Sequence, residues 1–126
     1  MRLSSIAKLL YGQLQASEFS AELAGDLLAH TRALATKGTS APVTVTEDAD
    51  VALDAQGLAV LCLLFASGQL TASELAYTAD ALQLADRVTF SDPSVVDGLA
   101  ECTDPEINGP LSIDRALEIA SNGAAA

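Results

Sequence analysis

Apolar residues recur every three or four positions in the first part of the chain. This spacing runs over residues 3–14 and again over residues 17–36, and it predicts two amphipathic helices. Lys37 and Gly38 predict the end of the second helix, because a cation is favourable at the C-terminal end of a helix and glycine turns easily into the left-handed region. The chain is therefore expected to begin with a pair of helices.

The middle of the chain holds the most apolar segment. Residues 51–66 are apolar on nearly all sides, which predicts a helix at the centre of the core. Residues 71–86 are expected to form the next helix. Asp92 and Pro93 then predict a helix start, since aspartate caps the first backbone N–H groups and proline fits the first helical position. That helix is expected over residues 94–102, and a last one over residues 112–121.

Two short segments have the composition of strands. Residues 43–46 alternate valine with threonine, and residues 88–90 are also rich in β-branched side chains. Residues 46–50, which include three acidic side chains, are interpreted as the entry to the central helix. A two-stranded pair is marginal alone, so it would need helices packed behind it. The sequence thus predicts a mainly α fold: a compact bundle of five to six helices with a minor two-stranded β element, in a single domain over residues 1–126, with residues 124–126 as a frayed tail.

One pattern occurs twice, and a third time in looser form. Residues 12–19 and residues 68–75 match at six of eight positions, and residues 109–116 resemble both. Thr71 and Glu74 have the spacing of a capping box, and Leu70 and Leu75 that of a hydrophobic staple. We interpret each copy as the turn of a helical hairpin.

A calcium site is the alternative interpretation of the third copy. Asp104, Glu106, Asn108 and Gly109 resemble the first positions of an EF-hand loop. Such a loop needs a bidentate carboxylate at its twelfth position, where this sequence has Arg115. No metal or other cofactor is therefore expected.

Charge is distributed very unevenly. The net charge is −11, from 17 acidic and 6 basic residues. Arg87 and Arg115 are the only basic residues after Lys37, so residues 38–126 carry nearly all of the negative charge. Such a surface repels phosphate groups, so neither nucleic acid nor an anionic membrane is expected as a partner, whereas a basic protein would be attracted.

The densest acidic segment supplies the candidate binding residues. Glu47, Asp48, Asp50 and Asp54 lie just before the most apolar run of the chain. They form either a solvated helix entry or a docking patch for a cationic partner.

Residues for catalysis are few. The sequence has neither a phosphate-binding loop nor a dinucleotide fingerprint, and His30, four residues after Asp26, is its only near-neutral base. Cys62 and Cys102 form no Cys-x-x-Cys motif, which fits a reduced, cytoplasmic setting. Cys62 is expected to be buried and Cys102 to be open to thiol reagents. The longest apolar run is half the length that spans a bilayer, and the charge of Lys8 inside the first apolar stretch argues against a signal peptide.

Three functions remain after these exclusions. The first is a non-enzymatic acidic module that binds a basic protein, such as an immunity-type protein or another small inhibitor. The second is a structural or homo-oligomeric helical subunit. The third is a small enzyme that uses His30.

Overall fold

The structure is a computed structural model that describes residues 1–35, 43, 45–103 and 111–125. The described chain is mainly helical, with a small parallel sheet, which confirms the predicted fold class. In chain order the elements are α1 (Leu3–Leu10), α2 (Ala16–Ala35), β1 (Val51–Leu53), α3 (Ala55–Ala66), α4 (Ala72–Leu84), β2 (Val88–Phe90), α5 (Pro93–Glu101) and α7 (Ile113–Ala125). Helix α7 continues beyond the expected end at residue 121.

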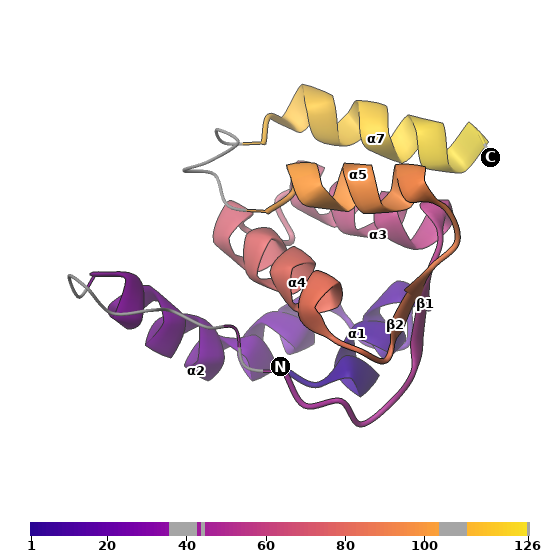
Figure 1. The fold of residues 1–126 in the computed structure, drawn as a ribbon. Helices are drawn as coiled ribbons and strands as arrows, with labels where there is room; N and C mark the ends of the chain where they lie inside the picture. Colours follow the sequence, from indigo (N-terminus) through magenta and orange to yellow (C-terminus); the bar gives the residue numbers. More distant parts are fainter. Residues whose placement is uncertain (36–42, 44, 104–110, 126) are drawn as a thin grey trace.

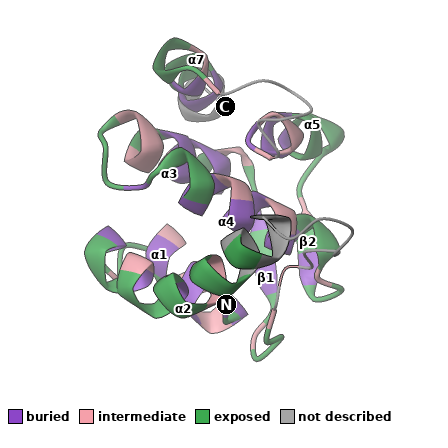
Figure 2. Cartoon of the chain, turned by 90° about the vertical axis from the view of Figure 1, so that its left-hand side faces the viewer, coloured by how far each residue is buried: buried purple, intermediate pink, exposed green. Residues whose placement is uncertain are grey.

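The helices form two groups joined by α4. Helices α3, α5 and α7 lie side by side at the top of Figure 1, while α1 and α2 lie below them and α4 crosses between the groups. Buried residues gather on the faces that these helices turn toward one another (Figure 2). Ile6 of α1, Leu82 of α4 and Leu99 of α5 are each fully buried and belong to one cluster, so one core runs through both groups.

The sheet differs from the one that the sequence predicts. Strands β1 and β2 pair in parallel, with Val51 opposite Val88, so the helices α3 and α4 connect them. The first strand of the sheet is therefore at residues 51–53 and not at the predicted position, where the described residues 43, 45 and 46 make only an isolated bridge from Thr46 to Arg2. The expected helix entry at residues 46–50 and the helical assignment of residues 51–53 are also wrong.

Asp54 explains where the strand stops and the helix starts. Its side chain accepts a hydrogen bond of 2.8 Å from the backbone N–H of Gly57, which makes Asp54 the N-cap of α3. Val51 and Leu53 are buried while Ala52 is exposed, which is the alternation of a strand. The cap thus divides one apolar run into a strand and a helix.

The repeated segments form the same turn. Gly12 has φ of 72° and Gly68 of 81°, both in the left-handed region. After each glycine, the next two N–H groups donate to a single carbonyl one turn back, of Lys8 in the first copy and of Leu64 in the second. The second copy also has the predicted capping box between Thr71 and Glu74. The helical-hairpin interpretation is confirmed for these two copies.

Among the described residues, no helix is long and apolar enough to cross a membrane.

Candidate functional site

A groove lies where the end of α1, strand β1 and the start of α3 meet. It encloses a cavity of about 300 Å³. Its apolar lining includes Ala7 and Leu10 of α1 and Val60 of α3, and its polar lining includes Tyr11, Asp50 and Asp54. No lysine or arginine contributes to this lining. We refer to it below as the α1–β1–α3 groove.

Tyr11 is the most exposed aromatic residue of the chain. It follows the last turn of α1 and is 73% exposed, whereas Phe19 and Tyr77 are buried in the core. Phe65 and Phe90, the other two aromatic residues, are partly buried against the same core. The ring of Tyr11 contributes nothing to the core and is available for contact with another molecule.

Asp50 and Asp54 lie in this groove with their orientations fixed. Asp50 Oδ1 accepts a bond of 2.8 Å from Nε of Arg87, and Asp54 Oδ1 accepts the helix-capping bond from Gly57. The hydrogen bond and the charge of Arg87 hold the pKa of Asp50 below its usual value. The described residues give no hydrogen bond to either Oδ2 atom. Each carboxylate is thus held in place and keeps one oxygen for an outside donor.

The other two predicted residues hold the segment before β1. Glu47 Oε1 accepts a bond of 2.9 Å from the backbone N–H of Arg87. Asp48 accepts bonds of 2.9 and 2.7 Å from the backbone N–H and the hydroxyl of Ser4, and these bonds lower the pKa of Asp48. Neither residue lines the groove. The four predicted acidic residues therefore divide into two in the groove and two that fasten the segment to α1 and β2.

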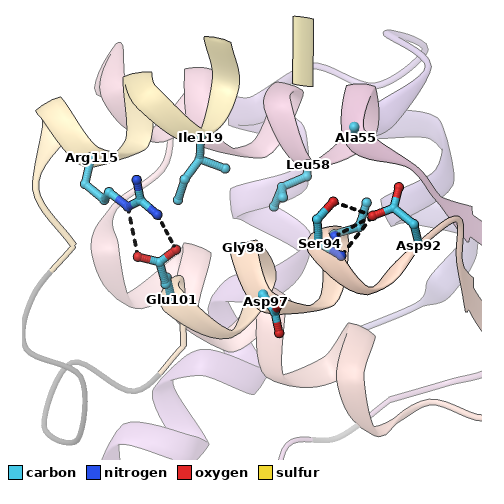
Figure 3. Close-up of a pocket in the computed structure, with 10 residues that line it drawn as sticks. Ala55, Leu58, Asp92, Ser94, Asp97, Gly98, Glu101, Arg115 and Ile119 are labelled. Carbon is cyan, nitrogen blue, oxygen red and sulfur yellow. Dashed lines mark hydrogen bonds and ion pairs between the residues drawn. The ribbon is translucent and has the colours of Figure 1, made fainter. Parts of the chain in front are cut away.

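A second groove, of about 300 Å³, lies between α3, α5 and α7 (Figure 3). Glu101 faces Arg115 across it through two bonds of 2.9 and 2.8 Å, and Arg115 also pairs with Glu118 at 2.9 Å. These bonds keep the pKa of Glu101 low and raise that of Arg115. Asp92 caps α5. Since internal partners already bind most of its charged groups, this groove is the weaker candidate for a charged ligand.

The two cysteines are both buried, which corrects the expectation that Cys102 is open to reagents. Cys102, the C-cap of α5, packs against Cys62 of α3, and its sulfur lies 3.5 Å from the Gly98 carbonyl oxygen. The hydrogen bond to Cys62 and burial both raise the pKa of the Cys102 thiol. The two cysteines are forty positions apart in the sequence, so no local pattern indicates this contact.

The other residues that the sequence suggested for catalysis or metal binding form no site among the described residues. Asp26 accepts a hydrogen bond from the N-terminal amine of Met1, and nothing is described of the His30 side chain on α2. Asp104, Glu106 and Asn108 lie outside the described residues. In the part of the chain that is described, no group of three or more histidine, cysteine or acidic side chains could hold a metal ion.

Comparisons with protein-family models, with curated proteins and with solved structures gave no match.

Proposed function

We propose that this protein is a non-enzymatic binding module that docks a basic segment of a partner protein in the α1–β1–α3 groove. The observation that carries the proposal is the composition of this groove. Two oriented carboxylates, Asp50 and Asp54, line the same groove as the exposed Tyr11, and no lysine or arginine lines it. A lysine or arginine fits such a site, because its aliphatic stem can contact the ring while its charged end reaches a carboxylate.

The distribution of charge over the whole chain supports the same partner. Arg87 is paired with Asp50, and Arg115 with Glu101 and Glu118, so both cations of residues 38–126 are already engaged. The other acidic residues leave this part of the chain with a strongly negative net charge. The attraction of such a charge speeds the approach of a basic protein and weakens as salt is added.

A small inhibitor or an immunity-type protein is the form of this function that we propose, acting in the cytoplasm. Proteins of this kind work by covering a surface of their target, so they need an oriented contact surface and no catalytic group. The proposal therefore requires neither His30 nor a metal ion.

Capture from a lysate of the source organism tests the proposal when a matched pair of variants is compared. Asp50→Asn with Asp54→Asn removes both charges of the groove, and asparagine still caps α3. Asp86→Asn with Asp97→Asn is the control, because these exposed residues carry the same charge and make no bond to the described residues. We expect one basic protein to be retained at low salt by the wild type and the control, and lost with the groove variant. Equal loss with both variants would show that net charge alone drives capture.

Self-association is a second candidate, favoured by the outer face of α7. Ile113 and Leu117, one helical turn apart, are 54% and 43% exposed. An apolar pair of this kind supports packing against a second copy. Light scattering at several concentrations tests it: a salt-insensitive dimer that Leu117→Ser converts to monomer supports this candidate, and a monomer throughout excludes it.

A further inference from the structure

Among the described residues, strand β1 is paired along one edge only, and Val51 and Ala52 of this strand line the groove. At the ends of the ladder, the Val51 N–H donates to Arg87 and the Ser91 N–H donates to Leu53, each at 3.0 Å. Val51 and Leu53 therefore direct their backbone groups toward β2. Successive residues of a strand alternate in this respect, so the N–H and C=O of Ala52 point away from β2. No described residue forms a hydrogen bond with them.

The groove occupies the space beside this edge. Val51 and Ala52 line it together with Ala7, Leu10 and Tyr11 of α1. Helix α1 packs near the strand, and the groove of about 300 Å³ is the space lined by residues of both elements. An unpaired strand edge of this kind is a template for the backbone of another chain.

The side chains along β1 define what a new strand would meet. Asp50, Ala52 and Asp54 are exposed and alternate with the buried Val51 and Leu53. The two carboxylates thus flank Ala52 symmetrically on the solvent side, about 13 Å apart along an extended chain. Between them, the small side chain of Ala52 leaves space for a larger one.

We propose that the partner binds as an extended segment that adds a strand to the open edge of β1. The segment has basic residues four positions apart, with a β-branched residue midway between them. The basic residues then face Asp50 and Asp54, and the central residue lies over Ala52. Cross-strand pairs of opposite charge are favourable in this arrangement. This inference rests on the proposed function and adds the conformation and the sequence pattern of the ligand.

Two peptides of identical composition test the pattern. In a strand, acetyl-Lys-Thr-Val-Thr-Lys-amide has both lysines and the valine on one face. In acetyl-Thr-Lys-Val-Lys-Thr-amide, both lysines lie on one face and the valine lies on the other. Each is titrated into the full, ¹⁵N-labelled chain at low salt. We expect the first peptide to bind at least fivefold more tightly, and to slow hydrogen exchange at the Ala52 amide at least tenfold.

A backbone variant tests the strand edge directly. Ala52→Pro removes the N–H that would pair with the peptide, and proline is tolerated at an edge position. Ala52→Val is the control, since it keeps the N–H and suits a strand. We expect binding of the first peptide to fall at least tenfold in the proline variant and to persist in the valine variant, with both variants folded by circular dichroism.

The outcomes separate this inference from the proposed function. Equal binding of the two peptides without protection of Ala52 would overturn strand addition and leave docking by charge intact. Absence of binding by either peptide would also overturn strand addition. The proposed function fails separately, when the groove variant Asp50→Asn with Asp54→Asn captures its partner as well as the wild type does.

Discussion

Asp50 and Arg87, thirty-seven residues apart, form an ion pair of 2.8 Å that joins the segment entering β1 to the segment entering β2. The pair is exposed, with Asp50 82% and Arg87 45% accessible. The pair occupies Oδ1 of Asp50 and holds the carboxylate in one orientation at the edge of the groove. Arg87 therefore competes with an incoming cation for the same carboxylate.

The first prediction concerns this competition. Arg87→Gln should strengthen binding of the lysine peptide with the same-face pattern, because it leaves Asp50 unneutralised. The free energy of unfolding should fall by about 1 kcal/mol or less, since exposed ion pairs contribute little. Peptide titration and urea unfolding measure the two effects. Weaker peptide binding in this variant would contradict the competition between Arg87 and an incoming cation.

The second prediction concerns the central helix. Leu61→Ala should lower the free energy of unfolding by about 2–5 kcal/mol, because it opens a cavity in the core. Leu63→Ala, on the same helix but 49% exposed, is the matched control and should cost much less. Urea unfolding compares the two variants, and equal costs would be inconsistent with the described core.

The third prediction concerns the repeated turn. Thr71→Ala removes the hydroxyl that accepts the Glu74 N–H at 3.1 Å, and should destabilise the protein by about 1 kcal/mol. Ser73→Ala, an exposed change in the same helical turn, should have almost no effect. A thermal melt distinguishes them. Indistinguishable melting temperatures would argue against the capping box.

The fourth prediction concerns the thiols. Both Cys62 and Cys102 should resist a thiol reagent in the native protein, because both are buried and the pKa of Cys102 is raised. Both should react at once in concentrated urea. Mass spectrometry of the labelled protein counts the modified thiols. Rapid native labelling of Cys102 alone would instead restore the expectation from the sequence.

The fifth prediction concerns acid. The hydroxyl of Ser4 lowers the pKa of Asp48, so its contribution to stability is present above the ordinary carboxyl pKa and is lost as pH falls through the lowered one. Ser4→Ala should therefore be less stable than the wild type at pH 6. This difference should shrink as the pH falls below the ordinary aspartate pKa of about 4, because Asp48 then becomes protonated in both proteins. Urea unfolding at several pH values measures the difference in the free energy of unfolding between the two proteins. A difference that grows as the pH falls would contradict the lowered pKa of Asp48.

The helices could be predicted from the sequence, and the strand β1 could not. Helical periodicity and caps such as Asp92–Pro93 are local signals, and they place most helices to within a few residues. Val51 to Leu53 has only three residues and runs directly into the apolar residues of α3, so no period separates strand from helix there. Asp54 was the available signal, because an aspartate inside an apolar run marks a helix start.

Only part of the candidate site could be predicted from the sequence. Asp50 and Asp54 were identified by their charge, but Tyr11 is some forty residues away and comes to the groove only because α1 packs beside β1. Glu47 and Asp48 looked equivalent to them in sequence. Their different roles follow from contacts with Arg87 and Ser4, which depend on the folded structure.

We propose that the α1–β1–α3 groove, rather than negative charge in general, recognises the partner. The most direct measurement is the dissociation rate of the captured partner from wild type and from Tyr11→Ser, by surface plasmon resonance at low and high salt. Tyr11 is exposed, so this variant should fold normally. Tyrosine and serine are both uncharged, so the net charge of the protein is unchanged. We expect dissociation to be at least tenfold faster at both salt concentrations, as for an aromatic residue that carries much of an interface. An unchanged rate would contradict this proposal.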